Sequence, residues 1–209
     1  GGGGWGQAAC VTNSYAGCTP TPSDSGSSAP QGAGSAIATA GDFAHGVIAQ
    51  SVGGGGGNGG SFEGAAAASL LAFQVGGGGS TGADARPAEV YFDNLLLQTA
   101  GENARGIIAQ SIGGGGGNGG NAVSLDVATP LAFQVGGSSG DGGAGGTAQV
   151  QLDASTLVTS GSNAGAILAQ SVGGGGGTGG SASGMDASVG FTMDVALGGS
   201  GGNGGSAGD

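Results

Sequence analysis

The sequence has no lysine, and Arg86 and Arg105 are its only strongly basic residues, against 13 acidic residues. The net charge of −11 argues against nucleic acid or an anionic membrane as a partner, because both attract basic surfaces. No apolar run approaches the roughly 20 residues of a membrane-spanning helix, so the chain is not expected to cross a membrane. Aromatic residues make up only 4% of the chain, and any core is therefore expected to consist of small side chains.

Cysteine is also scarce, and the two cysteines lie in the least regular part of the chain. Cys10 and Cys18 fall within residues 1–33, which also hold three of the five prolines and the single tryptophan. In a secreted chain, two cysteines at this spacing are expected to close a small disulfide loop. Two thiols and the distant His45 do not make up a metal ligand set, so neither a metal ion nor another cofactor is expected.

Glycine, in contrast, supplies 58 of the 209 residues, and it is arranged periodically. The block GVIAQSVGGGGGNGG begins at residue 46, GIIAQSIGGGGGNGG at residue 106 and AILAQSVGGGGGTGG at residue 166. A fixed period of 60 residues is typical of a stacked repeat architecture, in which each unit buries its apolar face against the next. The chain therefore divides into an atypical segment (1–33) and three repeats, 34–93, 94–153 and the shorter 154–209.

The glycine tract in each block is expected to be ordered, because it keeps one position directly after an apolar strand. Glycine chains can adopt the polyproline II conformation, which has three residues per turn and rises about 3.1 Å per residue. A tract of eight residues then matches its preceding strand in length, and we expect it to run back over that strand. Bare backbones allow the close approach that such packing needs. A bulky substitution such as Gly115→Val is expected to unfold an ordered layer.

Short apolar or alternating segments between the glycine tracts predict strands, and no amphipathic helix of useful length is present. Alternation is clearest at LLAFQV (70–75) and PLAFQV (130–135), and a threonine-containing strand precedes each AQS block. The predicted fold is all-β: a parallel β-solenoid, similar to a β-helix, with glycine layers of the polyproline II type. The number of coils in each 60-residue repeat is left open.

The combination of AQS block, glycine tract and a second glycine-rich connector resembles the glycine-rich repeats of bacterial autotransporter passenger regions. The resemblance covers about residues 34–209. It implies a β-helical, adhesin-like passenger that is displayed outside the cell outer membrane. The sequence has neither an initiator methionine nor a signal peptide, and we expect it to be a piece of a longer chain.

Catalytic chemistry is not expected. His45 has Arg105 and Gly165 as its repeat equivalents, which predicts a solvent-facing position without a catalytic or ligand role. A polysaccharide-cleaving β-helix would need two carboxylates about 5 to 10 Å apart, and the scattered acidic residues do not identify such a pair. An ice-binding surface would need more hydroxyl columns than the single one formed by Thr39, Thr99 and Thr159.

Two columns of polar residues keep one register through the repeats. If the repeats stack in line, each side-chain amide can bond its equivalent in the next repeat, as in stacked strands. Alternatively, each glutamine caps its own glycine tract. The columns are Gln50, Gln110 and Gln170, and Asn58, Asn118 and Thr178.

These features predict a non-enzymatic, extracellular segment with a structural and adhesive role at a bacterial cell surface. Its partners would be a host surface or a glycan, bound through variable connectors (19–32, 79–87 and 138–147), because loops tolerate the variation that recognition uses. The alternatives are a self-associating filament or phage-fibre component and, further away, a carbohydrate-active β-helix.

Overall fold

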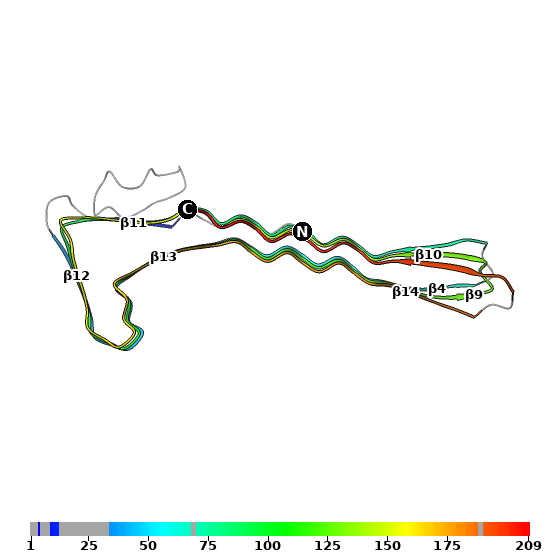
Figure 1. Cartoon of the computed structure of the whole chain (residues 1–209), viewed down its shortest axis with the longest axis horizontal. Coiled ribbons are helices and arrows are strands. Elements are labelled where there is room, and N and C mark those ends of the chain that lie inside the picture. The colour runs from blue at the N-terminus through cyan, green and yellow to red at the C-terminus, as the bar shows by residue number, and fades with distance from the viewer. Residues whose placement is uncertain (1–3, 5–8, 13–33, 68–69, 188–189) are drawn as a thin grey trace.

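The computed structural model describes residues 4, 9–12, 34–67, 70–187 and 190–209, and all of the regular structure in them is β. These residues form fifteen strands in five three-stranded parallel sheets, without a helix. Three coils lie on top of one another in Figure 1, and each coil is one circuit of the chain. The protein is therefore a parallel β-solenoid, as predicted, with one coil in each 60-residue repeat.

Strands pair with their own equivalents in the next repeat, which explains why the 60-residue period is strict. Val47 pairs with Ile107, and Ile107 pairs with Ile167. The third repeat departs from this period near its end, where Leu131 pairs with Met193, 62 positions later. The first sheet also departs, since Ala9 pairs with Ala88, which places part of the atypical first segment in the stack.

At one end of each coil, three sheets enclose a three-sided lobe that we call the head (Figure 1). We name each sheet after its central strand. The β6 sheet contains β1 (Ala9–Thr12), β6 (Ala88–Asp93) and β11 (Ala148–Asp153); the β7 sheet contains β2 (Ser35–Thr39), β7 (Leu95–Thr99) and β12 (Thr156–Thr159); the β8 sheet contains β3 (Val47–Val52), β8 (Ile107–Ile112) and β13 (Ile167–Val172).

The head holds the main apolar core. Alternate side chains of β6, β7 and β8 point inward, and Val90, Leu97 and Ile107 are fully buried there. Burying side chains of this size stabilises a fold by about 1.5 to 3 kcal/mol each. The middle coil is therefore the most completely packed part of the stack.

Between the head and the far end of the coil, two layers of glycine-rich backbone run side by side, and we call this part the waist (Figure 1). The first layer contains residues 53–60, 113–120 and 173–180, and the second contains 76–85, 136–145 and 198–207. Gly77, Ser80 and Ala83 donate N–H bonds of 2.8 to 2.9 Å to Gly60, Gly57 and Gly54 in the facing layer. This three-residue spacing is that of polyproline II.

The waist is also bonded along the stack. Gly53, Gly56 and Gly59 donate to Ile112, Gly115 and Asn118 of the next coil, at 2.7 to 2.8 Å. The first tract thus continues straight on from its strand and packs against the second tract. The expectation that it runs back over its own strand is wrong, because the facing glycine layer supplies the backbone partners.

The three-residue period determines which glycines are packed against a neighbouring backbone. A Cβ on Gly117 would lie 2.1 Å from the Gly57 carbonyl oxygen, and one on Gly116 would lie 2.1 Å from that of Gly140. A Cβ on Gly115 would meet only the Gly175 oxygen, at 3.8 Å, and Gly115 is exposed. The expectation that Gly115→Val unfolds the layer is therefore wrong, because position 115 faces outward.

A column of buried serines fixes the junction between head and waist. Ser111 Oγ donates to the Arg86 carbonyl oxygen at 2.9 Å and accepts from Gly146 N at 2.8 Å. In the preceding coil, Ser51 Oγ accepts from Arg86 N at 2.9 Å. The serine of each AQS block thus joins the outgoing strand to the returning chain.

Beyond the waist, the two layers become two facing sheets that we call the tip. The β9 sheet contains β4 (Phe62–Ala67), β9 (Ala122–Val127) and β14 (Ala182–Asp186); the β10 sheet contains β5 (Ala72–Val75), β10 (Leu131–Val135) and β15 (Met193–Leu197).

The tip carries its apolar residues on the outside. Ala122, Ser124 and Ala132 are buried between the two sheets, whereas Phe73 is 63% and Val75 59% exposed. The waist holds the two layers at the distance of packed bare backbones, and this distance continues into the tip. Only small or flat polar side chains fit inside, so the larger apolar residues face outward.

Candidate functional site

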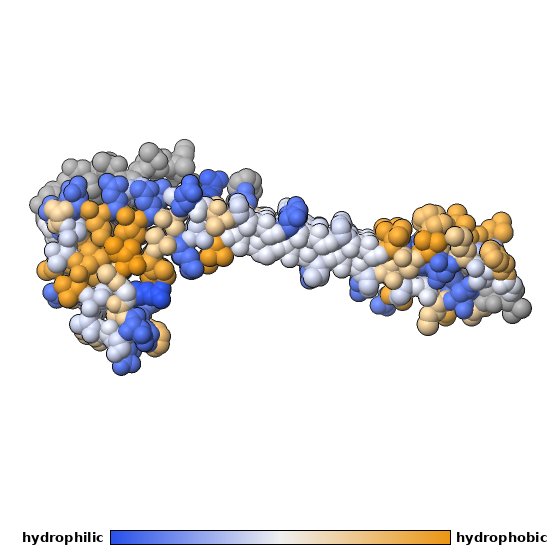
Figure 2. Space-filling model, viewed as in Figure 1, coloured by the Kyte–Doolittle hydropathy of each residue, from blue (hydrophilic) through white to orange (hydrophobic). Residues whose placement is uncertain are grey.

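The outer face of the tip gathers exposed and half-buried apolar side chains (Figure 2). On the β10 sheet, Phe73 and Phe133 stack with ring centroids 5.0 Å apart and an interplanar angle of 13°. Contiguous exposed apolar surface marks an interaction surface in many soluble proteins. The apolar tip face consists of Leu71, Phe73, Val75, Leu131, Phe133, Val135, Met193, Val195 and Leu197.

The interior of the tip is a polar network. Gln134 Nε2 donates to Ser124 Oγ at 2.9 Å, and Ser124 Oγ donates to Asp126 Oδ2 at 2.7 Å. These bonds join the β9 and β10 sheets. Four other buried atoms of the tip, Gln74 Oε1, Asp126 Oδ1, Thr129 Oγ1 and Gln134 Oε1, have no hydrogen-bond partner among the described residues, although buried polar groups usually have one. The network ties the sheet that carries the apolar face to the facing sheet.

A second candidate surface is a groove on the outside of the β8 sheet, beside the turns that lead into its strands. Each turn closes with a backbone bond, from Ala44 to Gly41 at 3.1 Å and from Ala104 to Gly101 at 3.3 Å. A threonine hydroxyl fixes the same turn, since Thr99 Oγ1 donates to the Ala104 carbonyl oxygen at 2.8 Å.

The threonine column therefore faces the interior. Thr99 is 1% exposed, and Thr39 and Thr159 make the same bond to Ala44 and Ala164, at 2.7 and 2.8 Å. These hydroxyls hold turns and do not form a surface array. The single column considered for ice binding is thus not available to ice.

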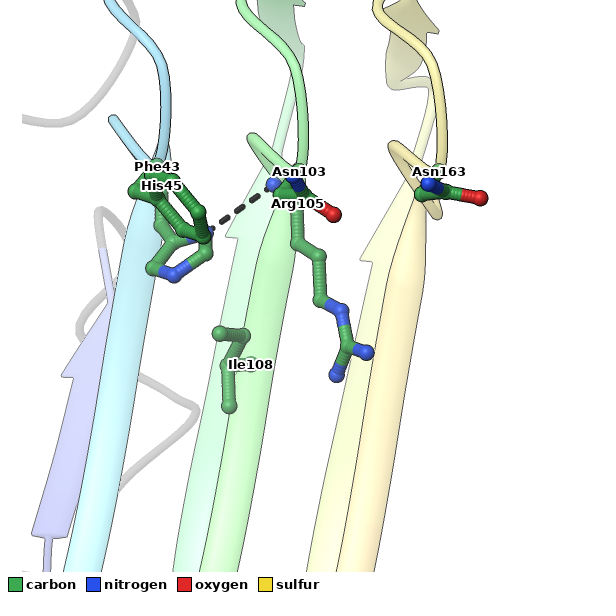
Figure 3. A pocket seen from close by; sticks show the side chains of 6 residues that line it. All are labelled: Phe43, His45, Asn103, Arg105, Ile108 and Asn163. Atoms are coloured by element: carbon green, nitrogen blue, oxygen red, sulfur yellow. Dashed lines mark hydrogen bonds between the residues drawn. The ribbon is translucent and has the colours of Figure 1, made fainter.

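Residues of all three coils line the outer groove (Figure 3), which has a volume of about 300 Å³. The Arg105 side chain runs beside Ile108 toward the third coil, where the equivalent residue is Gly165. Among the described residues, no carboxylate lines the groove, although the chain is strongly acidic. The lining residues are Phe43, His45, Asn103, Arg105, Ile108 and Asn163.

A hydrogen bond between coils orients the imidazole of His45. Its Nδ1 accepts from Arg105 N at 3.0 Å (Figure 3). A neutral imidazole that accepts at Nδ1 carries its proton on Nε2, so His45 can still offer one N–H donor. The sequence predicts a solvent-facing residue at this position, whereas the structure places His45, half-buried, in the wall of the groove.

Phe43 occupies a backbone conformation that phenylalanine rarely adopts. Its φ is 57°, and the equivalent residues Asn103 and Asn163 both have φ of 55°. Asparagine tolerates this left-handed region, whereas a bulky side chain is disfavoured there by roughly 1 to 2 kcal/mol. The Phe43 ring is nevertheless 68% exposed, so core packing does not explain its presence.

Replacing Phe43 with asparagine is therefore expected to stabilise the protein by about 1 kcal/mol. The reverse change at the equivalent position, Asn163→Phe, should destabilise it by a similar amount. Urea unfolding followed by circular dichroism would measure both. A lower midpoint for Phe43→Asn would show that the ring contributes more to stability than its backbone conformation costs.

The glutamine column forms a ladder along the outside of the β8 sheet. Gln50 Nε2 donates to Gln110 Oε1 at 2.7 Å, and Gln110 Nε2 donates to Gln170 Oε1 at 2.9 Å. The amides thus bond from coil to coil. The three strands are held in register by side chains as well as by backbone.

Gln110→Leu is expected to lower stability by about 1 to 2 kcal/mol, because it removes both ladder bonds. Gln98→Leu is the matched control. Gln98 also lies on an outer strand face, but its partners Ala38 and Val158 have no side-chain amide with which to form a ladder. Thermal unfolding of the two variants would measure the difference. Equal midpoints would show that the ladder does not contribute to stability.

The asparagine column behaves differently from the glutamine column. Asn58 Oδ1 accepts from Asn118 N at 2.8 Å, and Asn118 Oδ1 accepts from Thr178 N at 2.9 Å. Each side chain therefore caps a backbone N–H of the next coil. Thr178 keeps a side-chain bond as well, because its Oγ1 donates to Asn118 Oδ1 at 3.0 Å.

The two cysteines and the variable connectors are the remaining features that the sequence singles out. Cys10 lies in β1 and is disulfide-bonded, while Cys18 lies outside the described residues, so the pairing stays a prediction. The connector at 19–32 also lies outside them. The connectors at 79–87 and 138–147 are mostly packed in the waist, where Ser80 and Gly143 donate backbone bonds to the facing layer. That they bind a partner stays a prediction.

Within the described residues, no three histidine, cysteine, aspartate or glutamate side chains gather as a metal site would require. Nor do these residues contain a helix long and apolar enough to cross a membrane.

Comparison with known proteins does not assign the chain to a family. No family model matches it, and no curated protein matches its sequence. A solved structure, described as a nine polyproline type II helical bundle antifreeze protein from the springtail Granisotoma rainieri, is 19% identical to this chain. The match covers 86% of this chain and 89% of that chain, with a TM-score of 0.14. At this TM-score the two folds are not shown to be alike.

Proposed function

We propose that the chain is a non-enzymatic structural and adhesive segment, displayed outside the cell by a bacterial surface or secreted protein. The observation that carries this proposal is the apolar tip face, which the waist holds away from the head (Figure 2). A surface of this kind gains free energy by being covered, at roughly 25 cal/mol per Å² of apolar area.

The waist suits such a role because it is a rigid spacer. Its layers are hydrogen-bonded to each other and along the stack, so the tip cannot swing as it would on a flexible glycine linker. The resemblance of the repeats to autotransporter passenger regions supports an extracellular location. A host cell surface is the partner that we propose for the tip.

Retention of protein-coated beads on an epithelial cell layer under flow would test this proposal. We expect the double variant Phe73→Ser, Phe133→Ser to lose most of the retention, because it removes the stacked rings at the centre of the face. Leu96→Ser is the control, since Leu96 is an outward apolar residue of the head, 45% exposed. Equal retention of both variants, or none by the unaltered protein, would contradict an adhesive tip.

Axial self-association is a second candidate, favoured by the ends of the stack. Ile107 is fully buried in the middle coil, whereas its equivalent Ile167 is 49% exposed in the outer coil. A further coil from a second copy would cover it and extend each parallel sheet. Concentration-dependent fibres in electron micrographs would support this candidate, and a monodisperse monomer at high concentration would contradict it.

A further inference from the structure

We infer that the outer groove binds the carboxylate-bearing ring of an acidic sugar, such as a uronic acid unit of a glycan. This deepens the adhesive function proposed above and rests on it for its biological meaning. The groove is separate from the apolar tip face, because it lies on the head at the opposite end of the coil (Figure 1).

The charge of the groove is unusual for this chain. Arg105, one of only two arginines, lines it together with His45, and no carboxylate in the described part of the chain does. No ion pair links the Arg105 guanidinium to another described residue. A guanidinium offers two parallel N–H donors that match a carboxylate, and this pair is still available.

The neutral lining residues match the rest of a sugar ring. The side-chain amides of Asn103 and Asn163 form no hydrogen bond with another described residue, so both can donate to and accept from sugar hydroxyls. The exposed Phe43 ring gives a flat apolar surface for the non-polar face of a pyranose. This use also gives a reason for the strained φ of 57° at that position, since strain of this kind gathers where ligands bind.

Size and backbone pairing distinguish a sugar from an acidic peptide. The volume of about 300 Å³ lies at the lower end of the range for ligand pockets, roughly 300 to 1,000 Å³, which suits a single ring. A peptide bound as an added strand would need unpaired backbone at a sheet edge. The floor of the groove is instead the face of the β8 sheet, where the strand backbones pair with one another.

Titration of the whole chain with methyl glucuronide, followed by NMR, tests the inference. We expect saturable shifts of the Arg105 side-chain N–H and of the turn amides, with a dissociation constant in the millimolar range. Methyl glucoside, which has the same ring without the carboxylate, should bind at least about tenfold more weakly. Arg105→Gln should weaken glucuronide binding by about tenfold or more, because it removes a charge-assisted pair.

Two further variants separate binding from folding. Phe43→Asn should lose most of the glucuronide binding while raising the unfolding midpoint, so misfolding cannot account for the loss. Arg86→Gln should leave the affinity unchanged, because Arg86 does not line the groove. Equal affinities for the two sugars, or unchanged binding by Arg105→Gln, would overturn the inference.

Acetate and a tetraglutamate peptide serve as competitors. If either competitor displaces glucuronide at a concentration no higher than the one at which glucuronide half-saturates the groove, then the groove is a general carboxylate or peptide site. In that case the sugar assignment is wrong. Bead retention that depends on Phe73 and Phe133 is measured independently. A groove that binds no glucuronide would therefore refute this inference without refuting an adhesive tip.

Discussion

Gly117→Ala is expected to unfold the waist, although it adds a single methyl group. The new Cβ would lie 2.1 Å from the Gly57 carbonyl oxygen and 2.6 Å from its carbonyl carbon. Both atoms belong to a backbone that is bonded on several sides, so neither can move alone. Forcing extra volume into a packed region typically costs about 1 to 3 kcal/mol, and we expect a value at or above the upper end.

Gly115→Ala is the matched control for that variant. It makes the same chemical change two residues earlier, where a Cβ meets nothing closer than the Gly175 oxygen at 3.8 Å. Its stability should be unchanged or slightly raised, since alanine restricts the unfolded chain more than glycine does. Hydrogen exchange followed by mass spectrometry would report both variants. Equal protection of residues 113–120 in the two would contradict close packing of the glycine layers.

Leu97→Ala should have a comparably large effect, on the head. Leu97 is fully buried in the apolar core and pairs with Ile37 and Leu157 in the neighbouring coils. Truncating a buried leucine to alanine costs about 2 to 5 kcal/mol. We expect urea unfolding to show a loss in this range, with the slope of the transition unchanged.

Leu96→Ala provides the comparison within the same strand. Leu96 faces outward and is 45% exposed, so its truncation should cost less than about 1 kcal/mol. A loss as large as that of Leu97→Ala would mean that the outer face of the β7 sheet is covered as well. It would then require a different assignment of inside and outside in the head.

Much of this fold follows from the sequence, because the repeat makes each position predict its neighbours. The spacing of the AQS blocks predicts in-line pairing, and Gln50, Gln110 and Gln170 are bonded in a single column. The glycine tracts predict close-packed backbone of the polyproline II type. One fixed period accounts for both, since it brings like residues to the same height in successive coils.

Other features depend on distances that the sequence does not contain. Whether Gly115 or Gly117 is packed depends on the rotation of one extended helix against two neighbours. The alternation at Leu71, Phe73 and Val75 predicts a strand but not its inner face. The narrow separation of the two layers decides that face, and it reverses the usual arrangement of apolar residues inside.

The outer groove is the feature that the sequence indicates least. Its residues come from three coils, and His45, Arg105 and Gly165 differ although they are equivalent. This variation predicts a solvent-facing position without a catalytic or ligand role. The signal that could have found the groove is the phenylalanine at a turn position where both equivalents are asparagine.

The three-residue period of the waist also restricts how its length can change. Adding one or two residues to a single tract would rotate every later side chain away from its partners. Adding three to both layers of every coil would keep all contacts and lengthen the spacer by about 9 Å, at about 3.1 Å per residue. The length of the waist, and with it the distance between head and tip, can therefore change only in whole turns of three residues.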